Sequence, residues 1–295
     1  MNQNQNQNQI QQQQKIGIAA LKSVLNNDSI KQKFVDMLGK KAQGFITSVI
    51  NVCSNNKMLA NAEANSIVLA AANAAALDLP IDPNLGYAAI VPFNDKNKGC
   101  VVATFQIMRN GWVELAQRTC KIKKLNCEAV YEGELVSKNR FTEEYVFDEN
   151  KRKSDTVIGY MAYLATTDGF EKTIYWTIDD MKRHAMRYSQ TFKKGYGLWL
   201  DNFDAMAKKT LTKHIIVKFA PKSISTALYE AASKDEAAFT GDINNPQPVY
   251  VDNQQEEQVE EFQEAVVVVE EDGEEHQVPD GVNPETGEMQ FEEQQ

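Results

Sequence analysis

Residues 198–221 (LWLDNFDAMAKKTLTKHIIVKFAP) carry the pattern that most constrains the fold, because core-forming positions recur there every three or four residues. This spacing predicts one long amphipathic helix that packs one side on a core. The core-facing positions are Trp199, Phe203, Met206, Thr210, Leu211 and Ile215. Pro221 is expected to end the helix. We take this helix as the element around which the rest of the chain is organised.

The same segment also concentrates lysines. Lys208, Lys209 and Lys213 follow one another closely, Lys218 comes later, and no acid follows Asp204 within the segment. Acids near a helix start and cations near its end both suit the helix dipole. Two interpretations remain open: a core helix with a solvated lysine face, or a helix that offers its lysines to a phosphate chain.

Charge is segregated along the 295 residues, so the net charge of −10 is misleading. Residues 241–295 contain 17 acidic side chains and neither lysine nor arginine. The preceding 240 residues hold all 31 basic side chains against 24 acidic ones, a net charge of +7. A basic body with an acidic tail suggests an anionic partner for the body.

Composition divides the chain into three parts. Residues 1–25 are expected to be disordered, since the first 14 are almost purely Asn and Gln. Residues 26–239 form the predicted core, and residues 240–295 form a flexible acidic tail with a short helix or strand near 257–270. The tail could bind a partner, mimic DNA in the binding site until displaced, or simply add solubility.

Periodicity and turn signals predict both helices and an antiparallel sheet in the core. Helices are expected at 30–51 (weakened by Gly39 and Gly44), 57–76, 108–119, 177–189 (capped by Thr177 or Asp179) and about 223–238. Strands are expected as a hairpin at 86–94 and 100–107, and then at 125–136, 141–148, 156–167 and 170–177. Asp168-Gly169 is the strongest two-residue hairpin signal in the chain.

Motifs of common enzymes are missing from the sequence. It contains neither G-x-x-x-x-G-K-[ST] nor G-x-G-x-x-G, and its three histidines are far apart. Asp201 and Asp204 could bind Mg²⁺ from one helix face, although complementing the helix start is the simpler role. Reduced thiols in a cytosol are expected for Cys53, Cys100, Cys120 and Cys127, since no signal peptide or membrane-spanning apolar run is present.

Cations and aromatic rings alternate between residues 181 and 218. This mixture is typical of single-stranded nucleic acid binding, in which cations follow the phosphates and rings stack on bases. The aromatic residues are Tyr188, Phe192, Tyr196 and Trp199, of which Trp199 is expected in the core. The cations are Lys182, Arg183, Arg187, Lys193, Lys194, Lys208, Lys209, Lys213 and Lys218.

Three motifs in the same order give the chain a family resemblance. LDLPIDPNLGYAAIVPFN, FQIMRNGWVELAQR and WLDNFDAMAKKTLTK resemble segments of the RecT branch of the RecT/Redβ family of phage single-strand annealing proteins, over about residues 26–238. Where relatives often carry Gly-Tyr-Lys-Gly or Gly-Tyr-Arg-Gly, this chain has Met108-Arg109-Asn110-Gly111. The resemblance therefore implies that Arg109 takes the role of the basic residue that relatives carry in this motif.

The resemblance implies an α+β core with a bent antiparallel sheet flanked by helices. It implies an oligomer, as a ring or helical filament, that binds single-stranded DNA in a basic groove and anneals a complementary strand without ATP. It requires no cofactor and allows Mg²⁺. It also implies a bacterial host cytosol, no membrane, and a C-terminal region that meets a host single-strand-binding protein or a phage exonuclease.

Annealing requires that base pairing, and not the protein, reads the sequence, so the protein should grip phosphates and leave base edges free. The predicted DNA-binding residues are Gln106, Arg109, Asn110, Arg118, Lys182, Arg183, Arg187, Tyr188, Lys193, Lys194, Lys208, Lys209 and Lys213. The rival interpretations are a passive single-strand-binding module, a Mg²⁺-dependent nuclease acting through Asp201 and Asp204, and an assembly protein that only self-associates.

Overall fold

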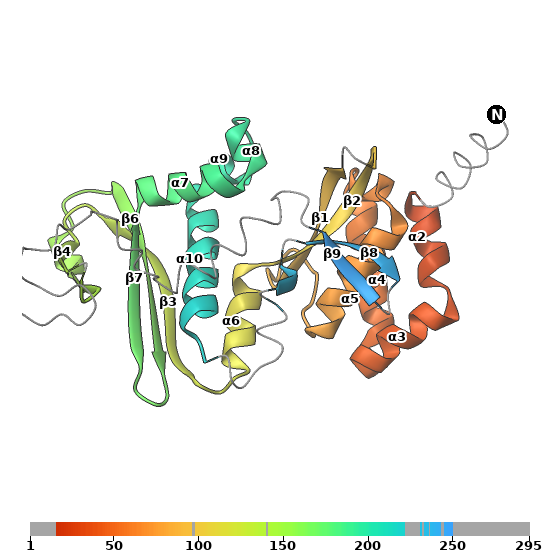
Figure 1. Ribbon diagram of the computed structural model, residues 1–295, viewed down its shortest axis with the longest axis horizontal. Helices are drawn as coiled ribbons and strands as arrows, with labels where there is room; N and C mark the ends of the chain where they lie inside the picture. The colour runs from red at the N-terminus through yellow and green to blue at the C-terminus, as the bar shows by residue number, and fades with distance from the viewer. Residues whose placement is uncertain are drawn as a thin grey trace, which may run out of the picture. The chain divides into compact units, whose positions relative to one another are not determined.

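The structure is a computed structural model that describes residues 16–95, 98–139, 141–221, 231, 233–235, 237–242 and 245–249. Runs of helices and runs of strands follow one another along it, and the named strands pair antiparallel (Figure 1). The mixed α+β class predicted from the sequence is confirmed, with the strands divided over separate sheets and helices packed on them.

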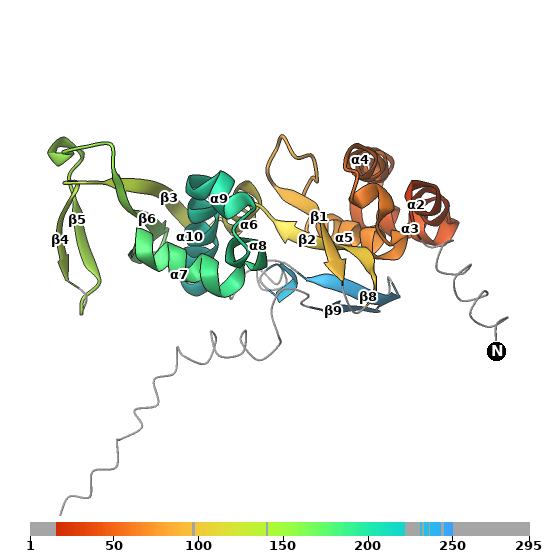
Figure 2. The ribbon, with the colours of Figure 1, turned by 90° about the horizontal axis from the view of Figure 1, so that it is seen from above.

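Four helices form the first part of the described chain. They are α2 (Ile18–Leu25), α3 (Asp28–Leu38), α4 (Ala42–Asn55) and α5 (Ala64–Ala76), with 3₁₀ turns at Gly39–Lys41 and Leu59–Asn61. Helix α5 contacts α2, α3 and the first sheet, and most of its residues are buried (Figure 2). Its many alanines permit this close packing on several sides.

Two predicted boundaries in this part are wrong. Disorder was expected through residue 25, but α2 is helical from Ile18, and Leu21 and Leu25 are buried in the core. The helix expected at 57–76 begins only at Ala64. The predicted division of 30–51 is confirmed at Gly39, whose φ of 56° ends α3, whereas Gly44 lies inside α4.

The first sheet has the order β1-β2-β8-β9. The predicted hairpin is confirmed as β1 (Ala88–Asp95) and β2 (Cys100–Ile107). Strands β8 (Ala238–Asp242) and β9 (Asn245–Val249) continue it (Figure 2). Structure thus extends past residue 240, where the flexible tail was predicted to begin. The tail segment 257–270 lies outside the described residues.

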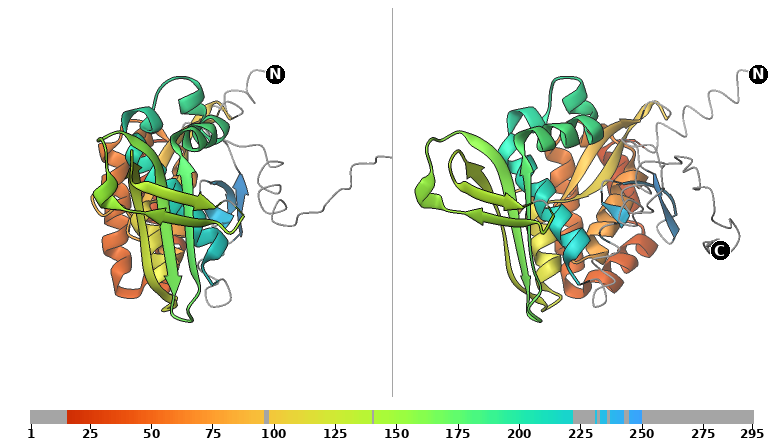
Figure 3. Two further views of the ribbon diagram at one scale, coloured as in Figure 1. Left: turned by 90° about the vertical axis from the view of Figure 1, so that its left-hand side faces the viewer. Right: turned by 60° about the vertical axis from the view of Figure 1, so that its left-hand side comes forward.

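The second sheet has the order β3-β6-β7. Its strands β3 (Ile122–Tyr131), β6 (Val157–Thr166) and β7 (Glu171–Thr177) run side by side (Figure 3). The predicted turn at Asp168-Gly169 joins β6 to β7. The single strand predicted at 125–136 is wrong: the chain turns at Gly133, where φ is 95°, and then forms a ribbon of β4 (Leu135–Asn139) and β5 (Glu144–Phe147).

Five further helices carry most of the predicted binding residues. They are α6 (Arg109–Gln117), α7 (Ile178–Tyr188), α8 (Gln190–Lys193), α9 (Leu198–Asp201) and α10 (Phe203–Phe219). Of the two predicted caps of α7, Thr177 and Asp179, it is Thr177 that caps the helix, in a reciprocal capping box with Asp180. The helix expected at about 223–238 falls largely outside the described residues.

The long helix predicted at 198–221 is interrupted. Asn202 leaves the helical conformation between α9 and α10, and its side chain caps α10 by accepting from the Ala205 N–H. Helix α10 packs across β6 and β3 and also against α6 (Figure 1). It therefore buries side chains on two sides, which include Leu211 and Ile215 but also Lys209 and Thr212.

Candidate nucleic-acid interface

The three clustered lysines of α10 have different surroundings. Lys208 Nζ lies 3.0 Å from a Glu128 carboxylate oxygen and 3.3 Å from an Asp204 oxygen. These two carboxylates raise the pKa of Lys208 against the opposing effect of desolvation by burial. Lys208 is therefore a compensated cation that joins α10 to β3.

Lys209 is buried, with 7% of its surface exposed. Its ammonium donates a hydrogen bond to the amide oxygen of Gln106 on β2, at 3.3 Å. Among the described residues it forms no ion pair with a carboxylate. A buried cation held only by a neutral amide is uncommon, because desolvation is costly without an opposite charge.

Lys213 reaches a third kind of partner. Its ammonium lies 2.8 Å from Oδ2 of Asp235, whose side chain is fully buried, in an ion pair without hydrogen-bond geometry. Asp235 Oδ1 accepts the Ile107 N–H at 2.7 Å. The pair therefore fixes the end of β2, the residue just before the β2–α6 junction, against α10.

The β2–α6 junction holds the second incompletely compensated cation. Arg109 is partly buried, donates to the Cys127 carbonyl at 3.4 Å, and has a buried Nε–H without a partner. It forms no carboxylate ion pair within the described part of the chain. Asn110 instead shapes the preceding turn, since its side chain donates to the Leu85 carbonyl at 2.9 Å.

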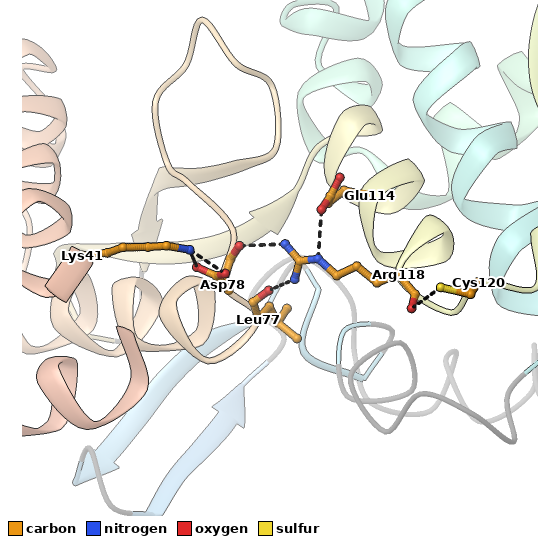
Figure 4. A network of polar contacts seen from close by, with 6 residues as sticks. All are labelled: Lys41, Leu77, Asp78, Glu114, Arg118 and Cys120. Atoms are coloured by element: carbon orange, nitrogen blue, oxygen red, sulfur yellow. Dashed lines mark hydrogen bonds and ion pairs between the residues drawn. The ribbon is translucent and has the colours of Figure 1, made fainter. Parts of the chain in front are cut away.

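Arg118 is part of an internal clamp at the end of α6 (Figure 4). Its guanidinium donates to the Leu77 carbonyl at 2.6 Å, the Asp78 carbonyl at 3.0 Å and the Glu114 carboxylate at 3.0 Å. Lys41 pairs with the carboxylate of Asp78 at 3.0 Å. Arg118 thus satisfies two backbone carbonyls just past the end of α5 and pairs with Glu114, a structural role that uses three of its donors.

Helices α7 and α8 expose the remaining predicted cations. Arg183 forms an ion pair with Asp180, and the Arg187 guanidinium lies 5.5 Å from the ring centroid of Tyr188. Tyr188 is partly buried against His184, with ring centroids 4.6 Å apart. The exposed cations of this surface, called the α7–α8 cationic surface below, are Lys182, Arg183, Arg187, Lys193 and Lys194.

The aromatic residues of this region divide between core and surface. Trp199 is buried, as predicted, and stacks edge-on against Phe203 and Phe192. Phe192 is therefore largely a packing residue. Sequence reasoning missed Trp176, which lies at the end of β7 beside His184 and His214. Its place in a predicted strand gave no sign that its ring would border the cationic surface.

The nuclease alternative rests on Asp201 and Asp204, and their surroundings give it little support. Asp204 is ion-paired with Lys208. No group of three or more His, Cys, Asp or Glu side chains gathers in metal-binding fashion in the described residues.

No described helix combines the length and the apolar character needed to cross a bilayer.

The described residues thus combine an α+β fold, five exposed cations on and just after α7 and α8, and two cations, the buried Lys209 and the partly buried Arg109, that form no carboxylate ion pair among these residues. Such an arrangement is typical of the class of proteins that bind a polyanion. Comparison with known proteins gives the class a name. The model of the RecT family matches residues 43–251, and the chain belongs to the RecT family. Membership implies a role in recombination as a DNA-binding, single-strand annealing protein.

Two curated relatives match over most of their length. The uncharacterized protein YqaK of Bacillus subtilis (strain 168) is 39% identical over 228 residues, covering 77% of this chain and 76% of YqaK. Protein RecT of Escherichia coli (strain K12) is 25% identical over 221 residues, covering 72% of this chain and 79% of RecT.

Proposed function

We propose that this chain, as a homo-oligomer in the form of a ring or helical filament, binds single-stranded DNA in a basic groove and anneals a complementary strand without ATP. Family membership supports the annealing role. A host single-strand-binding protein or a phage exonuclease is the proposed partner of the C-terminal region, in the cytosol of a bacterial host.

The observation that carries this proposal is the pair of undercompensated cations, Arg109 and Lys209. Both are at least partly buried, and both lack a carboxylate among the described residues. Gln106, which accepts from Lys209, lies near the end of β2, and Arg109 begins α6 three residues later. Buried charge is normally neutralised by an opposite charge. A phosphate of the bound strand supplies that charge in this proposal.

The α7–α8 cationic surface supplies the longer-range attraction. Its cations are exposed, so they can follow a flexible backbone and release counterions when they meet phosphates. Such contacts carry no sequence information and leave base edges free for a second strand. Lys208, Lys213 and Arg118 have a structural role in this proposal: their internal partners hold α10, β2 and α6 in place beneath the bound DNA strand.

The proposal is tested by mixing two complementary oligonucleotides, each with one dye of an energy-transfer pair, with and without the protein and without nucleotide. Acceleration of duplex formation is expected. The Arg109→Gln variant should lose most of this acceleration, whereas Lys208→Met, which removes a compensated lysine, should retain it. Binding without acceleration would instead identify a passive single-strand-binding module.

The nuclease alternative is tested with the same strands. Labelled single-stranded DNA is incubated with Mg²⁺ or with EDTA and examined on a denaturing gel. Intact DNA in both samples is expected. Cleavage that needs Mg²⁺ and disappears in the Asp201→Asn variant would replace annealing by hydrolysis as the activity of this site.

A further inference from the structure

Strand β7 passes directly into helix α7 (Figure 1). A small pocket lies at this junction. Trp176, Asp180 and His184 line it, and its volume is about 320 Å³. The Trp176 and His184 ring centroids are 5.5 Å apart at an interplanar angle of 50°, so the two rings form an open angle and not a closed stack. The pocket thus presents aromatic surface together with a carboxylate.

Packing from α10 holds this aromatic surface in place. The His214 ring meets Trp176 edge-on, with centroids 4.8 Å apart. Burial lowers the pKa of His214 to about 4, with Lys218 and His184 adding to the effect, so His214 is uncharged at neutral pH. The side of Trp176 that faces the core is therefore covered by a neutral ring, and its orientation is fixed.

Trp176 differs from the other two tryptophans of the chain. Trp112 is fully buried and Trp199 is 6% exposed, whereas Trp176 is only partly buried. Packing in the core accounts for the two buried tryptophans. A partly exposed tryptophan that borders a pocket has ring surface left for a flat ligand.

Cations stand beside the pocket on the same helix. Positions three and four apart on a helix share a face, so Arg183 lies next to Asp180 and Arg187 next to His184. Arg183 is ion-paired with Asp180 and is thus held at the pocket edge. A flat aromatic surface flanked by arginines matches the alternation of base and phosphate in a single strand.

We propose that the Trp176 pocket takes one nucleobase of the bound single strand by stacking, while Arg183 and Arg187 hold the neighbouring phosphates. This inference rests on the proposed function and adds a base site to it. Stacking accepts any base, as annealing of arbitrary sequences requires. Stacking uses the face of the base, so it fixes the register of the strand on each protomer and leaves the pairing edges of the bases free.

The experiment compares a short oligothymidylate with an oligomer of equal length and charge that contains only abasic residues. Fluorescence anisotropy of a dye on the DNA reports binding, and intrinsic tryptophan fluorescence reports stacking. Both oligomers should bind, and only the oligothymidylate should quench the tryptophan emission. The Trp176→Phe variant should bind the oligothymidylate but lose the quenching, which assigns the signal to Trp176.

Affinity provides a second, independent readout. Trp176→Leu should weaken oligothymidylate binding about 5- to 150-fold, the range that corresponds to one stacked base, and leave abasic binding unchanged. Equal losses for both oligomers, or equal quenching by both, would overturn the base site while leaving DNA binding intact. If neither oligomer bound at all, the proposed function itself would fail.

Discussion

The Lys209→Met variant tests whether Lys209 serves DNA binding or the fold, because removing its charge should weaken DNA binding without lowering stability. In the folded protein Lys209 is 7% exposed, and its ammonium donates one hydrogen bond, to Gln106 at 3.3 Å. Losing a hydrogen bond to a charged group costs about 1.5–3 kcal/mol. Removing the desolvation penalty of an unpaired ion returns several kcal/mol, so the free energy of unfolding should stay constant or rise by about 2 kcal/mol.

DNA binding should weaken in the same variant. Each lost phosphate contact reduces the salt dependence by about 0.7 in the slope of log K against log salt. Between about 50 and about 200 mM salt, the ratio of wild-type to variant affinity should therefore shrink by about 2.6-fold. Urea denaturation gives the stability, and anisotropy titrations at several salt concentrations give the slope.

The neighbouring Lys208→Met is the matched control. Its two carboxylate partners are more than half exposed, so the loss of stability should stay below about 1 kcal/mol, with no change in the salt slope. The reasoning is refuted if Lys209→Met lowers stability by more than about 2 kcal/mol with an unchanged slope, because Lys209 would then be a packing residue.

Three further outcomes follow from the contacts. Lys213→Ala should lower stability by about 3–5 kcal/mol in urea denaturation, because it leaves the Asp235 carboxylate buried and unpaired; adding Asp235→Asn should restore part of the loss. Gly111→Ala should cost about 3 kcal/mol or more, since its Cβ would lie 2.1 Å from the Tyr87 carbonyl oxygen. Burial favours the neutral form of His214 and lowers its pKa to about 4, so its contribution to the free energy of unfolding is complete above about pH 6.5 and decreases by about 3 kcal/mol toward pH 4. Urea denaturation of the wild type and of His214→Phe across this pH range should isolate that decrease.

Local signals predicted the elements whose causes are local. The Asp168-Gly169 turn needs only a glycine where φ is positive, and here φ of Gly169 is 96°. The start of α7 needs only a capping side chain, which was expected from Thr177 or Asp179 and comes from Thr177. The break at Asn202 was also local, but the strong apolar spacing of 198–221 concealed it, although Asn is a preferred capping residue.

The candidate site was harder to predict, because compensation of charge depends on distant segments. No acid follows Asp204 within 198–221, so only Lys208, four residues after Asp204, had a visible partner, and Lys209 and Lys213 looked uncompensated in the sequence. In the fold, Lys208 meets Glu128 and Lys213 meets Asp235, and the same Asp235 accepts from a backbone amide 128 residues away. Periodicity within one helix carries no information on such partners.

This division of the cations makes the total salt dependence a test of the whole interface. Ten of the predicted binding residues are Lys or Arg, and three of them are engaged by other groups of the protein itself. Arg118 donates to backbone carbonyls, Lys213 pairs with the buried Asp235, and Lys208, whose own side chain is mostly buried, pairs with Glu128 and Asp204. The exposed pair of Arg183 with Asp180 is weak enough for a phosphate to displace. With seven cations available per protomer, an oligonucleotide that spans one protomer should show a slope of log K against log salt of about −5, against about −7 for all ten. A measured slope at the larger value would mean that the internal ion pairs open when DNA binds, and α10 would then have to move away from β3 and Asp235 as the strand enters.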